Sequence, residues 1–202
     1  ALIYFVTYLL ILYIASENLG YLLLGIAAGV AASVVAYHLF DHVQTRVTAW
    51  RDPWSTIDTK GYQVAQSLFA IGTGGGFGLG FDQGAPSTIP VAESDFIFSA
   101  IAEEFGTIFA ICVILVEISC FVMFMNIALK MSRRFYKLTA VGLAVEYFVQ
   151  VLLTIGGAIK FIPSTGVTLP LVSYGGSSVI SAVVLFCIIQ GMYVLSYEEV
   201  QA

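Results

Sequence analysis

Residues 19–40 read LGYLLLGIAAGVAASVVAYHLF, an apolar run without an Asp, Glu, Lys or Arg. A helix that crosses the hydrocarbon core of a bilayer needs about 20 consecutive residues of this kind. Gly25 and Gly29 lie four positions apart in the run, the small-xxx-small spacing that lets two membrane helices pack closely. The run predicts a membrane-spanning helix, and with it a membrane protein.

The composition of the 202 residues points the same way: 59% are hydrophobic and 10% are charged, and the mean hydropathy is +0.93. A soluble domain carries about 25% charged residues, so a soluble globular enzyme is excluded. The net charge of -5 excludes a nucleic-acid binder, which needs a basic surface. Cys112, Cys120 and Cys187 lie in apolar runs and indicate neither a disulfide framework nor a metal cluster. Because the chain begins inside an apolar run without Met, we expect it to be a fragment of a longer protein.

Similar runs between polar breaks predict an all-α, polytopic transmembrane helix bundle of about six spans, forming one domain over residues 1–202. The expected spans are residues 1–15, 19–40, 61–71, 96–129, 138–161 and 175–196. The run 61–71 is less apolar than the others and includes Gln63 and Ser67, so we expect it to face protein or water.

Sidedness is predicted from Lys and Arg, because cytoplasmic loops carry an excess of them. The segments 41–60 and 130–137 are the basic ones, so both are expected in the cytoplasm. Trp50 and Trp54 are expected to hold the loop 41–60 at the membrane interface. The loops 72–94 and 162–174 contain no Lys or Arg and are expected on the extracytoplasmic side.

Acidic side chains lie directly before and within the long predicted span 96–129. Glu93-Ser94-Asp95 precedes it, and either Ser94 or Asp95 is suited to cap the helix; alternatively, Asp95 faces a site at the outer membrane boundary. Glu103 lies about 12 Å further along the same helix, at a depth where ionisable groups mark a functional cavity or a buried partner. Of Glu103 and Glu104, only Glu103 has the angular position to share a cavity with Asp95, although a structural role is favoured for both.

The outer loops contain the remaining candidates. The glycine-rich run 72–80 lacks the Gly-Lys-Ser/Thr ending of a phosphate loop, which favours a tight turn with close backbone packing. The segment 160–178 is rich in Pro, Gly and hydroxyls and opens the last span. The free N–H groups of that helix start are suited to bind an anion, whereas Ser173 and Ser177 are equally suited to cap it.

Several motifs together resemble the SEDS family (shape, elongation, division and sporulation). They are Trp50-Arg51-Asp52-Pro53-Trp54, Gly61-Tyr62-Gln63, Ser94-Asp95-Phe96-Ile97-Phe98, Ala102-Glu103-Glu104-Phe105-Gly106 and the run from Pro163 to Ser178. The resemblance implies that the chain corresponds to the C-terminal half, spans five to ten, of a ten-span fold. Glu93-Ser94 stands where the family commonly has His-Thr, and Glu93 would either repel the charge on Asp95 or help it to hold a divalent cation.

The resemblance further implies an enzyme, an inverting peptidoglycan glycosyltransferase that polymerises lipid II at the outer face of the bacterial cytoplasmic membrane. Asp95 matches the family's essential acid and would act as the general base. Lys160, Ser94, Glu93, Ser173 and Ser177 are the expected substrate-binding residues, and Lys160, backbone N–H groups or a divalent cation, Mg or Mn, would neutralise the leaving pyrophosphate. The expected partners are lipid II, membrane lipids and a class B penicillin-binding protein, and no nucleic acid. A lipid II translocase and a non-catalytic scaffold for that transpeptidase are the alternatives.

Overall fold

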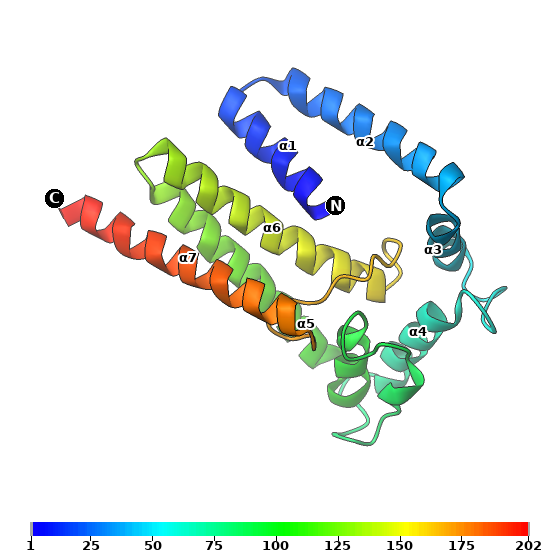
Figure 1. Ribbon diagram of the computed structural model, residues 1–202. Helices are drawn as coiled ribbons and strands as arrows, with labels where there is room; N and C mark the ends of the chain where they lie inside the picture. Colours follow the sequence, from blue (N-terminus) through cyan, green and yellow to red (C-terminus); the bar gives the residue numbers. More distant parts are fainter. Residues whose placement is uncertain (1, 202) are drawn as a thin grey trace.

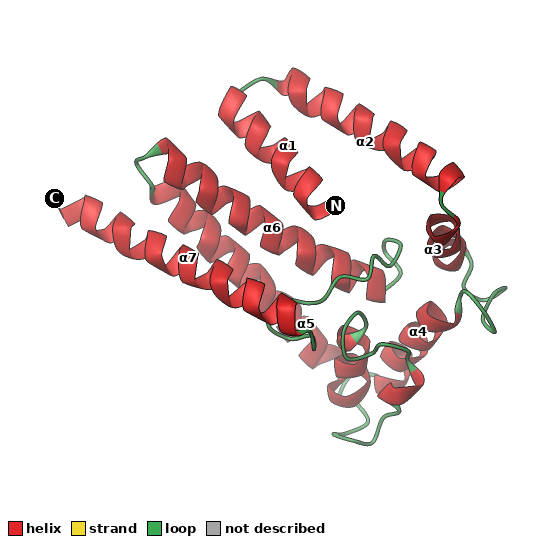
Figure 2. Cartoon of the chain, in the orientation of Figure 1, coloured by secondary structure: helices red, strands yellow, loops and turns green. Residues whose placement is uncertain are grey.

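The computed structural model describes residues 2–201, and within that range it contains helices and no strand. Figure 2 shows the helices joined by loops of very different length. In chain order they are α1 (Leu2–Ser16), α2 (Leu19–Leu39), α3 (Asp41–Arg51), α4 (Tyr62–Gly74), a short 3-10 helix (Pro86–Thr88), α5 (Ile97–Lys130), α6 (Arg134–Ala158) and α7 (Gly176–Gln201).

Four of these helices are long and apolar enough to cross a membrane, namely α2, α5, α6 and α7. The all-helical, multi-span prediction is confirmed, and the predicted spans 19–40, 96–129, 138–161 and 175–196 each match a helix to within a few residues. The shorter α1 is also apolar. The span predicted at 61–71 is wrong: α4 has 13 residues, a rise of about 20 Å against the roughly 30 Å of a bilayer core.

The long connections meet at one end of the bundle. Figure 1 shows α2 and α6 finishing, and α5 and α7 starting, at the end where α3 and α4 lie. The turns between α1 and α2 and between α5 and α6 lie at the opposite end. The loops 41–60, 72–94 and 162–174 therefore share one end, which we call the loop end.

This arrangement differs from the predicted topology, which puts 41–60 and 72–94 at opposite ends of the span 61–71. Arg46 and Lys60, which precede α4, line one cavity with Asp95, which directly follows the loop 72–94. Because α4 does not cross the membrane, the chain stays at the loop end from the end of α2 to the start of α5.

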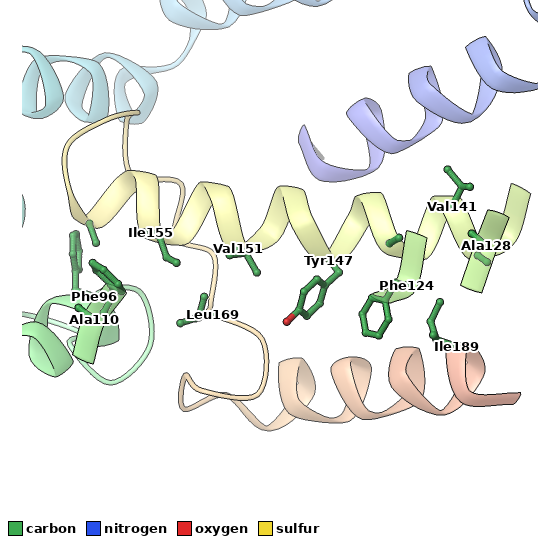
Figure 3. Packing of buried hydrophobic residues seen from close by; sticks show 14 of the residues in the cluster. Phe96, Ala110, Phe124, Ala128, Val141, Tyr147, Val151, Ile155, Leu169 and Ile189 are labelled. Atoms are coloured by element: carbon green, nitrogen blue, oxygen red, sulfur yellow. The ribbon is translucent and has the colours of Figure 1, made fainter. Parts of the chain in front are cut away.

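The core forms where α5, α6 and α7 pack together (Figure 3). Phe124 of α5 is 1% exposed, and its ring packs edge-on against Tyr147 of α6 at 5.2 Å and Phe186 of α7 at 4.9 Å. Such aromatic pairs add about 0.5–1.5 kcal/mol each beyond the apolar area that they bury. The Tyr147 hydroxyl also donates a hydrogen bond to Glu117, so this buried carboxyl has a partner.

Small residues and buried hydroxyls attach the remaining helices. A Cβ at Gly25 would lie 2.1 Å from Leu9, so this glycine of α2 gives α1 room to pack closely, as its spacing predicts. On α4, Ser67 is fully buried; its hydroxyl lies 2.6 Å from that of Ser99 on α5 and donates to the carbonyl of Ala158 on α6 at 2.8 Å. These two hydrogen bonds hold α4 against the two spans below the loop end.

The glycine-rich run joins α5 through backbone contacts. At Gly106 the backbone has φ 85° and ψ 168°, so α5 is kinked and its hydrogen-bond ladder is interrupted. The groups freed there bond to the run: Leu79 N–H donates to the Glu103 carbonyl at 2.9 Å, and Thr107 N–H donates to the Gly75 carbonyl at 2.9 Å. The close backbone packing predicted for 72–80 is confirmed, since a Cβ at Gly78 would lie 2.1 Å from the Glu104 carbonyl.

Candidate functional site: a cavity with one carboxylate and several basic groups

A cavity of about 300 Å³ at the loop end contains Asp95. Its lining comes from segments far apart in the sequence: α3, the start of α4, the turn before α5 and the α6–α7 connection. The lining residues are His42, Thr45, Arg46, Ala49, Lys60, Gln63, Val64, Asp95 and Ser164. One acid therefore shares the cavity with an Arg, a Lys and a His.

One face of α3 provides much of this lining. His42, Thr45, Arg46 and Ala49 follow one another at intervals of three, one and three residues, which places them on a single side of an α-helix. Trp50 fixes α3 against the rest of the site, because its indole N–H donates to the Lys160 carbonyl at 3.1 Å. The helix thus presents Arg46 and His42 to the cavity that contains Asp95.

Asp95 lies in a tight turn just before α5. Val91 adopts a positive φ of 54°, and its carbonyl accepts from the N–H groups of both Ser94 and Asp95 at 3.1 Å. The N-cap residue of α5 is Phe96, without a side-chain cap bond. The capping alternative for Ser94 and Asp95 is therefore wrong for this helix, and the Asp95 carboxylate faces the cavity instead.

The α6–α7 connection holds this turn from the other side. The buried Ser173 hydroxyl donates to the Ser94 carbonyl at 2.6 Å and accepts from the Leu169 N–H at 2.8 Å. The Tyr174 N–H donates to the Glu93 carbonyl at 2.8 Å. Main-chain carbonyls of the Asp95 turn are therefore bonded to 169–174, one by the Ser173 hydroxyl and one by the Tyr174 N–H.

Arg46 and Asp95 flank the same backbone position. A Cβ added at Gly166 would lie 3.3 Å from Nη2 of Arg46 and 3.4 Å from Oδ2 of Asp95. Arg46 also donates through Nη1 to the Ser164 carbonyl at 3.0 Å. Gly166 has φ +70°, which glycine adopts without the steric cost that a side chain would bring.

Lys160 occupies a different place from the one predicted. It is not among the residues that line the Asp95 cavity; the cations there are Arg46 and Lys60. The Asp52 carboxyl has its pKa held below its usual value near 3.8, chiefly by hydrogen bonds from Ser55, and the charge of Lys160 acts in the same direction. Lys160 therefore lies outside the cavity lining, and its contact with the site is through its carbonyl, which accepts from the Trp50 indole N–H.

The other predicted residues have three different placements. Ser94 and Ser173 position the Asp95 turn, as described above. Glu93 and Ser177 are exposed and do not line the cavity. Glu103 is buried and faces the loop 72–94, where Oε1 accepts from the Ala85 N–H at 3.3 Å. It does not line the Asp95 cavity, and this contact fits the structural role that was favoured for it.

The donor set of the cavity does not suit a divalent cation. Mg²⁺ and Mn²⁺ favour several carboxylate or carbonyl oxygens, whereas the lining offers one carboxylate beside two cationic side chains. In the part of the chain that the structure describes, no three His, Cys, Asp or Glu side chains gather as a metal site. Positive charge for an anionic ligand comes here from Arg46 and Lys60.

Sequence reasoning missed Arg46 and Lys60 because it counted them as cytoplasmic charges. A signal was present: His42, Thr45, Arg46 and Ala49 have helical spacing within a segment too polar to span a membrane. That pattern predicts a short helix with one polar face, but it does not say what the face contacts.

Comparison with known proteins identifies the family. A family model described as "Cell cycle protein" (FTSW_RODA_SPOVE) matches residues 1–197. Peptidoglycan glycosyltransferase RodA of Mycobacterium tuberculosis is 35% identical over 189 residues, 94% of this chain and 40% of that protein. Probable peptidoglycan glycosyltransferase FtsW of Escherichia coli O157:H7 is 34% identical over 204 residues, 98% of this chain and 49% of that protein. The chain thus spans less than half the length of these relatives.

The fold agrees with this assignment. A solved chain described under "Structural coordination of polymerization and crosslinking by a peptidoglycan synthase complex" matches with a TM-score of 0.74 and 24% identity, over 93% of this chain and 52% of that one. With a family model covering nearly the whole sequence, and relatives matched over most of it, the chain belongs to the FtsW/RodA/SpoVE family of cell cycle proteins.

Proposed function

We propose that this chain is the catalytic C-terminal portion of a peptidoglycan glycosyltransferase that polymerises lipid II, with Asp95 as the general base. The observation that carries the proposal is the cavity that joins Asp95 to Arg46 and Lys60. The curated relatives, named peptidoglycan glycosyltransferases, supply the reaction class.

The chemistry needs one base and one stabilised leaving group. The 4-hydroxyl oxygen of the acceptor sugar attacks the anomeric carbon of the donor sugar, and a new glycosidic bond forms with inversion. The proton of that hydroxyl passes to the Asp95 carboxylate, while the bond from the anomeric carbon to the pyrophosphate oxygen breaks. A general base held in this way contributes typically 10²–10⁴-fold to the rate.

Arg46 and Lys60 would stabilise the departing pyrophosphate. Its oxygens carry the negative charge that develops as the bond breaks, and a guanidinium binds such oxygens through paired N–H donors. Arg46 has one nitrogen bonded to Ser164 and a second close to Gly166 beside Asp95. These positions support a donor bound with its pyrophosphate on α3 and its sugar toward Asp95.

This function requires the loop end to face the outside of the bacterial cytoplasmic membrane. The density of Lys and Arg supports that orientation. At the opposite end, the segment 130–137 carries four of them within eight residues, whereas the four at the loop end, Arg46, Arg51, Lys60 and Lys160, are spread over residues 41–95 and 159–175. Lys and Arg are concentrated in cytoplasmic loops, so the 130–137 end would be cytoplasmic.

A transpeptidase partner, a class B penicillin-binding protein, is part of the proposal. The solved chain with the same fold is described as belonging to a complex that coordinates polymerisation and crosslinking. Glycan strands become a wall only when their peptides are crosslinked, so a polymerase and a transpeptidase that act together fit this chemistry.

The deciding experiment is lipid II polymerisation by the full-length protein and by its Asp95→Asn variant in proteoliposomes. We expect glycan strands from the wild type and none above background from the variant. A translocase would move labelled lipid II across the bilayer without forming strands. A non-catalytic scaffold would form no strands by itself, so the wild type and the variant would both stay at background.

A further inference from the structure

A second cavity lies between α5 and α7, toward the end of the bundle opposite the loop end. It is a groove of about 620 Å³, larger than the Asp95 cavity and separate from it in all its lining residues. Its floor is rigid, because the buried Phe124 ring packs against Phe186 at 4.9 Å. Figure 3 shows Phe124 and Ile189 beside each other where the two helices meet.

The lining of the groove changes from apolar to polar along its length. Asn126 and Lys130 lie one helical turn apart on α5, and Gln190 and Tyr193 lie nearly one turn apart on α7. Both helices run toward the same end of the bundle (Figure 1), so these four side chains collect at the end of the groove near Lys130. The rest of the lining is apolar, including Met123, except for Ser119, whose hydroxyl donates to the Leu115 carbonyl at 2.7 Å.

Charge in the groove has one sign. Lys130 is charged and exposed, and no Asp or Glu is among the lining residues in the described part of the chain. Lys130 ends α5 and Tyr193 carries a phenol hydroxyl, which is typical of side chains at the headgroup level of a membrane. The groove therefore offers amide and ammonium donors at the membrane surface and apolar walls below them.

The length of the groove suits an acyl chain. Its α5 lining runs from Ile118 to Lys130, a rise of about 18 Å at 1.5 Å per residue. One leaflet of the hydrocarbon core is about 15 Å thick. An acyl chain whose headgroup lies at Lys130 would therefore follow the groove through one leaflet.

We infer that the α5–α7 groove binds an anionic phospholipid, with the phosphate on Lys130, Asn126 and Gln190 and an acyl chain along Met123 and Phe124. Basic pockets between membrane helices bind anionic headgroups in this way. The inference does not depend on the proposed polymerase activity, because no residue of the Asp95 cavity takes part.

The test is native mass spectrometry of the full-length protein released from nanodiscs that contain equal phosphatidylglycerol and phosphatidylcholine. We expect the wild type to retain phosphatidylglycerol preferentially. Lys130→Gln should lower the retained phosphatidylglycerol about fivefold, as expected for the loss of about 1 kcal/mol per Lys near the surface, and Lys130→Arg should restore it. Met123→Trp, which fills the groove, should also lower it.

Lys137→Gln is the matched control, since it removes a basic residue at the same end but outside the groove lining. Equal loss from Lys130→Gln and Lys137→Gln would mean that the lipid responds only to general surface charge, and would overturn the inference. So would equal retention of the two lipids by the wild type. A photoreactive group at Met123 that crosslinks to a protein helix, from a further span or a partner, would likewise overturn it.

Discussion

The Ser173 hydroxyl donates a 2.6 Å hydrogen bond to the Ser94 carbonyl, across 79 positions of sequence. The same hydroxyl accepts from the Leu169 N–H, so one buried side chain fixes the α6–α7 connection to the residue before Asp95. The position of the carboxylate therefore depends on a side chain that bonds to the backbone beside Asp95 and not to the carboxylate itself.

Ser173→Ala should lower stability by about 1–3 kcal/mol, because it leaves the Leu169 N–H without its partner in a buried place. Polymerisation by the full-length protein should fall as well, since the Asp95 turn loses the Ser173 hydrogen bond that holds it to the α6–α7 connection. Thermal unfolding in detergent and strand formation are the measurements. Ser177→Ala is the control: Ser177 is exposed and outside the cavity lining, so little change is expected. An equal loss in both variants would contradict the positioning role of Ser173.

Asp95→Asn should reduce polymerisation by about 10²–10⁴-fold, because the amide cannot take the acceptor proton. Membrane insertion and thermal stability should remain close to wild type, since size is kept and Asp95 does not cap α5. Asp82→Asn tests whether the loss is specific: Asp82 is an exposed acid at φ 59°, a conformation that Asn tolerates. If Asp95→Asn polymerises normally, the carboxylate is not the base.

Arg46→Gln should weaken productive binding of lipid II by about 10–100-fold, the effect of losing a charge-assisted hydrogen bond of about 1.5–3 kcal/mol. The apparent KM for lipid II and a binding assay measure it. Arg51→Gln removes a basic residue of the same helix that does not line the cavity, and should have little effect. A result in which both variants bind lipid II like the wild type would remove α3 from the substrate site.

Gly106→Ala should destabilise the protein by about 1–3 kcal/mol or more, because the residue has φ +85° and its new Cβ would lie 2.4 Å from the Gly76 carbonyl. The glycine-rich loop would then separate from α5. Gly191→Ala is a matched control in α7, where nothing lies within 4 Å of the added Cβ, and Ala is the better helix former by about 1 kcal/mol. The unfolding midpoint should fall for Gly106→Ala and rise for Gly191→Ala. Equal shifts in the two midpoints would show that the kink at Gly106 does not require glycine.

The turn after α3 should loosen in acid. Because the pKa of Asp52 is lower in the folded protein than its usual value near 3.8, the folded state favours the charged form. The resulting stabilisation is complete above that usual value and is lost as the pH falls through the lower folded value. The protection factors of the Trp54 and Ser55 amides, which are observed exchange rates corrected for the intrinsic pH dependence of exchange, should fall between pH 6 and about pH 2.5. Asp52→Ala should show low protection at every pH, and a variant whose protection keeps the wild-type pH profile would show that Asp52 is not the cause.

Hydrophobic runs were sufficient to predict the long helices. The residues of α2 and α5 are apolar for longer than any soluble helix requires, so their class follows from composition along the chain. Asp95 was found for a similar reason: an acid directly before a long apolar helix stands out locally. The close packing of 72–80 followed from the absence of side chains at its glycines.

The neighbours of Asp95 could not be predicted in this way. Whether 61–71 crosses the membrane or turns back decides which loops share a side, and an 11-residue run of mixed polarity fits either reading. The structure resolves this through the buried Ser67, whose hydroxyl bonds to α5 and α6 and keeps α4 at the loop end. With α4 there, Arg46 and Lys60 come to the carboxylate and Lys160 does not line the cavity.

The sequence alone determined that this is a multi-span helical membrane protein with an acid at the start of its longest span. Those properties depend on local hydropathy, which each segment carries in itself. Only the tertiary structure decided which charges surround Asp95, because that cavity is made by four segments whose contacts are buried hydroxyls and backbone hydrogen bonds. The Arg46 guanidinium adds a hydrogen bond to the Ser164 carbonyl, 118 positions away, and none of these contacts leaves a pattern within any one of the segments.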